Sequence, residues 1–108
     1  MKKTVITSTG NGLSSIFDRR FGRAGWYCVF NEENGSVEFI ENKHSDAGHG
    51  AGTRAAEKMV EIGVEKILSG DFGPKAKELL DRFQIQMVIL KEEDITVGEI
   101  LERLKRAK

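Results

Sequence analysis

Apolar residues recur along the chain at two spacings, every second position in short runs and every third or fourth position in longer ones. The first spacing is typical of strands and the second of amphipathic helices. The predicted strands, in order, cover residues 3–7, 26–30, 36–42, 64–69 and 85–89. A predicted helix follows the third, the fourth and the fifth of these strands.

Residues with known positional preferences mark the helix ends. Gly63 is placed to end the first helix in a left-handed conformation. Pro74 is placed at the first position of the second helix, where its missing N–H costs nothing. Thr96 and Glu99 have the spacing of a capping box at the start of the third helix.

The order of the elements predicts a mixed sheet. Asn34-Gly35 is a hairpin signal, so the second and third strands should pair antiparallel. The later strand–helix–strand units favour right-handed crossovers and parallel strands. We therefore predict a three-layer α/β fold, with a five-stranded mixed sheet and helices on both faces, in one domain over residues 1–108.

Charge and composition exclude several classes of function. Lysine plus arginine and aspartate plus glutamate both total 17, which gives no support for a general nucleic-acid or membrane surface. Only a short apolar run follows the basic start, so we expect no signal peptide and no membrane span. We expect no nucleic-acid partner, no membrane partner and a cytoplasmic location.

The single cysteine, Cys28, also narrows the chemistry. It excludes an internal disulfide and a four-cysteine metal site within one chain, which suits a reducing cytoplasm. Cys28 alternates with Tyr27 and Val29 in a predicted strand. We interpret it as a buried core residue, with a cluster ligand as the alternative.

The segment from Ser8 to Gly25 follows the first strand and lacks a regular period. It contains the arginines Arg19, Arg20 and Arg23. A connection this long in a small domain is more often functional than idle, although a solvated loop is the alternative. Leu13, Ile16, Phe17 and Phe21 are expected to anchor it to the body of the protein.

A second polar segment leads from His44 into the first helix, which should begin at about Gly52 or Thr53. A helix N-terminus carries unpaired N–H groups and a partial positive charge, so it attracts anions. We predict that Gly50 and Gly52 bring the backbone close to an anion and that His49 is a metal ligand. His44 is interpreted as a solvated loop residue.

A third glycine-rich segment, Gly70 to Pro74, follows the fourth strand. In open α/β sheets, ligands collect beyond the carboxyl ends of the parallel strands, so all three segments should share one edge. Gly70 and Gly73 are candidate binding residues, although each also has an ordinary turn or cap explanation. No segment has the phosphate-binding loop or the complete dinucleotide fingerprint.

Three motifs resemble the dinitrogenase iron-molybdenum cofactor biosynthesis family, which includes NifX, NifY and the C-terminal domain of NifB. They are Phe21-Gly22-Arg23-Ala24 within residues 15–24, His49-Gly50-Ala51-Gly52, and Gly70-Asp71-Phe72-Gly73-Pro74. The similarity extends from the first strand to about Val88. It implies a ribonuclease H-like fold and a non-catalytic carrier of iron–sulfur or iron-molybdenum-type clusters or their precursors, with cluster-donor and acceptor proteins as partners.

The combined hypothesis is a pocket for an anionic metal–sulfur cofactor. Its candidate residues are Arg19, Arg20, Arg23, His49, Gly50, Gly52, Gly70 and Gly73, with His49 as the metal ligand. The alternatives are a small-anion or metabolite-binding domain and a protein-interaction domain without a cluster. A nuclease needs several converging carboxylates, and the expected central strand has none.

Overall fold

The computed structural model describes residues 2–45 and 50–106 and contains all of the predicted elements. The strands are β1 (Lys3–Ser8), β2 (Trp26–Asn31), β3 (Val37–Glu41), β4 (Val64–Ser69) and β5 (Gln86–Ile89). The helices are α1 (Ala51–Glu61), α2 (Pro74–Arg82) and α3 (Val97–Arg106). Their bounds differ only slightly from the expected ones.

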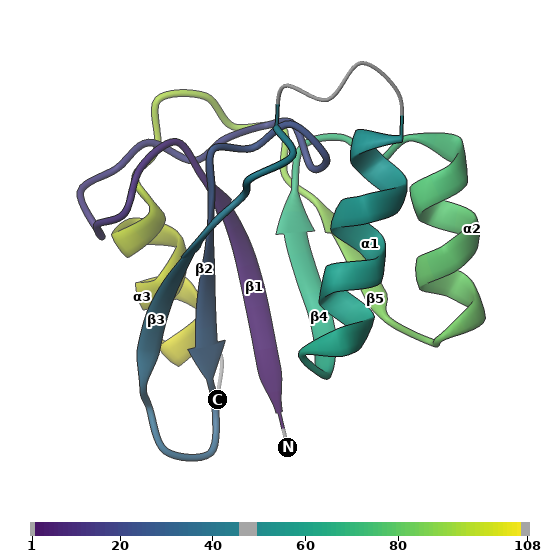
Figure 1. Ribbon diagram of the computed structural model, residues 1–108. Coiled ribbons are helices and arrows are strands. Elements are labelled where there is room, and N and C mark those ends of the chain that lie inside the picture. Colours follow the sequence, from purple (N-terminus) through teal and green to yellow (C-terminus); the bar gives the residue numbers. More distant parts are fainter. Residues whose placement is uncertain (1, 46–49, 107–108) are drawn as a thin grey trace.

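The five strands form one mixed sheet in the order β3-β2-β1-β4-β5 (Figure 1). β1 pairs antiparallel with β2 and parallel with β4, so it lies at the centre where the two pairing modes meet. β2 and β3 form the expected antiparallel hairpin, and β5 is parallel to β4. The predicted mixed sheet is therefore confirmed.

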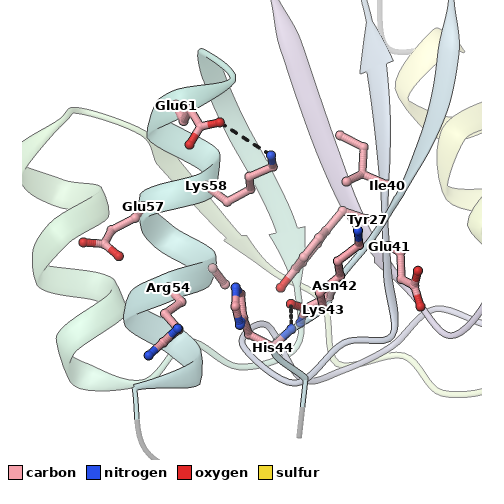
Figure 2. A pocket seen from close by; sticks show the side chains of 11 residues that line it. Tyr27, Ile40, Glu41, Asn42, Lys43, His44, Arg54, Glu57, Lys58 and Glu61 are labelled. Atoms are coloured by element: carbon pink, nitrogen blue, oxygen red, sulfur yellow. Dashed lines mark hydrogen bonds and ion pairs between the residues drawn. The ribbon is translucent and has the colours of Figure 1, made fainter. Parts of the chain in front are cut away.

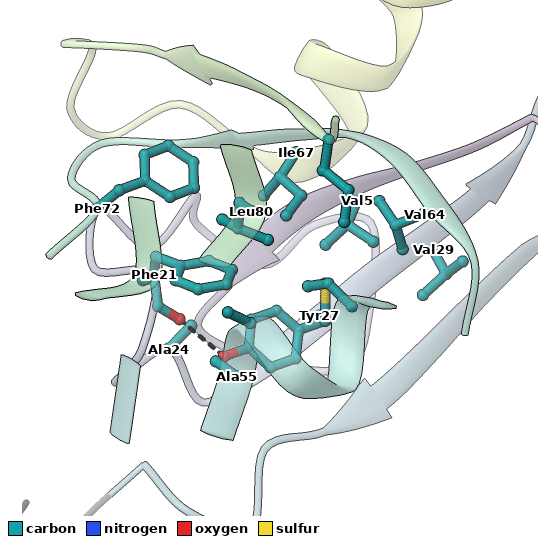
Figure 3. Close-up of a cluster of buried hydrophobic side chains, with 14 residues drawn as sticks. Val5, Phe21, Ala24, Tyr27, Val29, Ala55, Val64, Ile67, Phe72 and Leu80 are labelled. Carbon is teal, nitrogen blue, oxygen red and sulfur yellow. Dashed lines mark hydrogen bonds between the residues drawn. The ribbon is translucent and has the colours of Figure 1, made fainter. Parts of the chain in front are cut away.

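Helices cover both faces of the sheet, which confirms the three-layer arrangement. On one face, α1 and α2 pack through small and apolar residues, among them Ala55 and Leu80, which are buried (Figure 3). On the other face, α3 packs through Val97, Ile100 and Leu101. The alternation in β2 separates these two cores, because Tyr27 and Val29 belong to the first and Cys28 to the second.

Local signals define the helix ends as predicted. Gly63 has a φ of +76°, a left-handed conformation that favours glycine. At the start of α3, the Glu99 N–H donates to Thr96 Oγ1 at 3.1 Å, and the Thr96 N–H donates to Glu99 Oε1 at 3.4 Å. The capping box is therefore confirmed. Among the helices of residues 2–45 and 50–106, none has the length and apolar character needed to cross a membrane.

Cys28 is fully buried, as expected for a core residue. Burial raises the pKa of its thiol from 9.0 to about 11. Burial, together with the negative charge of Asp18, also raises the pKa of Tyr27. Both groups are therefore neutral in the folded protein at pH values where they begin to ionise in the unfolded chain.

We predict that the free energy of unfolding decreases as the pH rises from about 9 to about 11. The unfolded state then loses protons that the folded state keeps, and at about 1.4 kcal/mol per pKa unit Cys28 alone accounts for up to about 3 kcal/mol. Urea unfolding across this interval measures the change. The Cys28→Ala variant should show a shallower decrease, and parallel curves for the two proteins would contradict the assignment.

Candidate functional site

The loops that follow β1 and β4 and the starts of α1 and α2 lie at one edge of the molecule (Figure 1). We call this edge the rim and define it as residues 9–25, 43–45, 50–53 and 70–76. It lies at the carboxyl ends of the parallel strands, where α/β domains commonly bind ligands. The three glycine-rich segments of the sequence therefore do share one edge.

Backbone hydrogen bonds hold the long loop after β1 across the rim. The Asp18 N–H donates to Thr7 O at 3.0 Å and the Phe21 N–H donates to Asp71 O at 3.2 Å. Phe17 and Phe21 are 3% and 1% exposed, so their predicted anchoring role is confirmed. Phe21 also packs on Phe72 with ring centroids 5.1 Å apart. The loop is thus an ordered part of the body of the protein.

The prediction that Leu13 and Ile16 also anchor this loop is wrong, because they are 45% and 38% exposed. The loop contacts the start of α3 through its backbone instead. The Gly98 N–H donates to Leu13 O at 2.8 Å, and the Val97 N–H donates to Ser15 O at 2.9 Å. These bonds fix the main chain while the two apolar side chains point outward.

A buried carboxylate lies beneath the loop. Asp18 is 4% exposed, and Arg20 gives it three bonds of 3.0 Å, from the backbone N–H to Oδ1, from Nε to Oδ1 and from Nη2 to Oδ2. The hydroxyl of Thr7 contacts Asp18 O and lies 2.9 Å from Ser69 Oγ. This network joins the ends of β1 and β4 to the loop above them.

Each of the three predicted arginines lies at the rim and has a partner within the protein. Arg19 Nη1 lies 2.9 Å from Glu93 Oε1. Arg20 binds Asp18, and these hydrogen bonds raise the pKa of its guanidinium. Arg23 Nη1 donates to Ser45 O at 3.2 Å. The side chains of Arg19 and Arg20 remain 48% and 65% exposed, so both still present charge to solvent.

The predicted glycines shape the rim in different ways. Gly50 precedes α1 with a φ of +76°, and Gly73 precedes α2 in an extended conformation. Among the residues that the structure describes, neither helix start has a side-chain cap or an acidic residue in its first turn. A Cβ placed on Gly52 would lie 3.6 Å from Ala76 Cβ, so the two helix starts are neighbours. First-turn N–H groups have no partner within a helix, and here two sets lie together.

Gly22 and Gly70 allow the close packing of this edge. A Cβ on Gly22 would lie 2.6 Å from Gly52 Cα, and a Cβ on Gly70 would lie 2.7 Å from Arg19 Cβ and 2.8 Å from Arg19 O. All three distances are too short for a real contact. The sequence offered Gly70 as a binding residue, with an ordinary turn or cap as the alternative. The structure shows that Gly70 makes room for Arg19, and its binding role stays a prediction.

The structure describes one of the two histidines, His44. His44 is exposed, as expected for a loop residue, and its N–H donates to Asn42 Oδ1 at 3.1 Å. His49 and Asp46 lie outside the described residues, so the role of His49 stays a prediction. Within residues 2–45 and 50–106, no three His, Cys, Asp or Glu side chains are grouped so that they could hold a metal ion.

Sequence reasoning missed a pocket of ≈ 550 Å³ between α1 and β3, which we call the α1–β3 groove (Figure 2). The residues that line it are Tyr27, Ile40, Glu41, Asn42, Lys43, His44, Arg54, Ala55, Glu57, Lys58 and Glu61. They come from three separate elements, so no local pattern marks them. Sequence reasoning also missed the contact of Arg19 with Glu93, because the two residues lie far apart in the chain.

The fold and the rim define a small α/β protein whose carboxyl-edge loops gather arginine side chains and uncapped helix starts. The family model described as dinitrogenase iron-molybdenum cofactor matches residues 1–107. The chain therefore belongs to this family, and the resemblance seen in the sequence is confirmed.

Three known proteins are similar to most of this chain. An uncharacterized protein of Methanocaldococcus jannaschii is 30% identical over 90 residues, which cover 81% of this chain and 73% of that protein. The apo form of the orange protein from Desulfovibrio gigas has a TM-score of 0.88 at 30% identity, over 99% of this chain and 89% of that chain. A putative NifB protein from Thermotoga has a TM-score of 0.82 at 31% identity, over 98% and 89%. The family and the two solved structures support, in general terms, a role in binding or carrying a cofactor.

We predict that Gly22→Ala lowers the free energy of unfolding by about 1–3 kcal/mol, the usual cost of overpacking. The added methyl group would meet the backbone of Gly52, which cannot move without shifting the start of α1. Gly12→Ala is a matched control in the same loop, since a Cβ there would have no neighbour within 4 Å. Urea unfolding compares the two variants, and an equal effect on both would refute the close contact at the rim.

Proposed function

We propose that the protein is a non-catalytic binding or carrier protein for an anionic metal–sulfur cofactor or its precursor, of the iron–sulfur or iron-molybdenum type. The observation that carries the proposal is the pair of neighbouring, uncapped helix starts at a rim that also bears three arginines. Family membership supports the same ligand class. The solved orange protein is described as an apo form, which supports a ligand-bound form of that relative.

The physical chemistry of the rim suits such a ligand. Metal–sulfur clusters are commonly anionic, and their sulfides accept charge-assisted hydrogen bonds from guanidinium groups and oriented N–H groups. Gly50 and Gly52 leave the start of α1 without bulky side chains, which favours close approach of a ligand to the backbone. In this proposal Arg19 and Arg23 face the cargo, and Arg20 positions the loop through Asp18.

The proposed cargo is bound reversibly. Cys28 is fully buried in the core between the sheet and α3, and burial raises the pKa of its thiol. A cluster anchored by His49 and by hydrogen bonds would be released more readily than one held by four thiolates. Reversible binding is what a carrier between cluster-donor and acceptor proteins requires.

We predict that wild-type protein retains metal and sulfide after anaerobic incubation with tetrathiomolybdate, or with ferrous iron plus sulfide, followed by desalting. His49→Ala should retain much less, because it removes the proposed metal ligand. Arg82→Gln is the control, since Arg82 lies at the far end of α2 and pairs with Glu78. Metal and sulfide analysis gives the readout.

Equal retention by wild type and His49→Ala would remove His49 from the site. Retention by neither protein, together with a higher melting temperature in inorganic phosphate, would favour the alternative of a small-anion or metabolite-binding domain. Loss of retention in Arg82→Gln as well would show that binding depends on overall charge and would refute a defined site.

We also predict that Glu93→Gln increases the affinity for tetrathiomolybdate by about twofold to fivefold. Glu93 binds Arg19, so it competes with an anion for the same guanidinium. Glu92→Gln makes the same charge change at the neighbouring position, but Glu92 pairs with Arg103. Anaerobic titration measures both affinities. An equal gain in the two variants would mean that only net charge matters, and it would remove Arg19 from the site.

A further inference from the structure

The α1–β3 groove has features that the rim does not explain. Two helices cover the α1 face of a five-stranded sheet, and β3 at its edge extends beyond them (Figure 1). Ile40 of β3 is only partly buried, although its neighbour Tyr27 in β2 is 2% exposed. An apolar floor is therefore left open beside α1.

The floor of the groove offers apolar surface rather than hydrogen bonds. The Tyr27 hydroxyl donates to Phe21 O at 2.7 Å, so its polar end is already used within the protein. Of the three apolar residues that line the groove, Tyr27 and Ala55 are 2% and 4% exposed, so Ile40 supplies the open apolar surface (Figure 2). A ligand that rests here gains by burying hydrocarbon or aromatic surface.

One end of the groove is positively charged and preformed. Asn42 is buried and its Nδ2 donates to Gly22 O and Ala24 O at 3.0 and 2.8 Å, which fixes the turn that carries Lys43 and His44. The His44 ring and the Arg54 side chain lie on opposite walls of the groove at this end, His44 after β3 and Arg54 on α1 (Figure 2). Over residues 2–45 and 50–106, no ion-pair partner is seen for Lys43, His44 or Arg54.

The other end of the groove carries a neutral ion pair instead. Arg54, Glu57, Lys58 and Glu61 form one stripe along α1, and Lys58 Nζ lies 3.6 Å from Glu61 Oε1. Lys58 is thus neutralised by Glu61, and Glu57 points away from the groove (Figure 2). The helix dipole adds to this difference between the two ends, because Arg54 lies near the N-terminus of α1.

We propose that the α1–β3 groove is a binding site for an amphipathic organic monoanion, separate from the rim site. The anionic head lies between His44 and Arg54, and the apolar body lies over Tyr27, Ile40 and Ala55. A volume of ≈ 550 Å³ falls within the usual range of small-molecule pockets. At the far end Lys58 is already paired with Glu61 and offers a second anionic group little attraction, so a dicarboxylate fits less well. This proposal does not depend on the cargo of the rim.

The test uses three eight-carbon probes, octanoate, suberate and 1-octanol, which carry one, two and no carboxylates. Chemical-shift titration of isotope-labelled protein is expected to show saturable binding of octanoate at the amides of Ile40, His44 and Arg54. Suberate should bind about threefold to tenfold more weakly, because its second carboxylate loses water without gaining a free cation. Octanol should bind more weakly by a similar factor, because it lacks the charge contact.

Arg54→Gln and His44→Gln should each weaken octanoate binding about threefold to tenfold. Both side chains are exposed at positions without described ion pairs, so their loss should leave the fold intact, which circular dichroism checks. Arg82→Gln on α2 and Arg19→Gln at the rim are the matched controls and should bind as wild type does.

Three outcomes would each overturn the proposal. Equal binding of octanol and octanoate would show that only apolar surface is recognised. Wild-type affinity in both Arg54→Gln and His44→Gln would place the ligand elsewhere. Weakening by Arg19→Gln to the same degree as by Arg54→Gln would show that the groove and the rim are not separate sites.

Discussion

The burial of Asp18 is the constraint on which the rim depends. A carboxylate that is 4% exposed must have its charge and its oxygen atoms satisfied within the protein. Arg20 supplies three of the hydrogen bonds, and the backbone groups of Asp18 bond to Thr7. These bonds hold the loop after β1 in one path, and that path brings Arg19 over Gly70 and Gly22 against Gly52. Removing the Arg20 side chain would leave the buried charge of Asp18 without its ion-pair partner and would loosen the loop at the rim.

Much of the fold was predictable because its signals are local. Alternating residues in β2 place Tyr27 and Cys28 in different cores, and the spacing of apolar residues identifies every helix. The capping box of α3 and the left-handed Gly63 follow from residues within one turn of each other. The same logic failed for Leu13 and Ile16, because the loop packs on α3 through backbone atoms, which a pattern of side chains does not report.

The site was predictable only in outline. Topology brings Arg19, Arg23 and the glycine segments to one edge, and the order of strands and helices in the sequence implies that topology. The contacts that set the charge balance are long-range, such as Arg19 with Glu93, and the sequence has no mark for them. The α1–β3 groove was missed because it arises where two helices fail to cover the edge of the sheet. That shortfall follows from packing and not from any motif.

The starts of α1, α2 and α3 differ in their side-chain caps, and the difference matches the proposed binding role of the rim. A side-chain cap typically stabilises a helix by about 1 kcal/mol, and α3, whose start lies under the loop after β1, has one from Thr96 and Glu99. α1 and α2 begin after Gly50 and Gly73, which have no side chain to supply this bond. The chain thus forgoes a common source of stability at the two helix starts that meet at the rim. A cap there would occupy the N–H groups that an anion needs, so stability and binding compete for the same atoms.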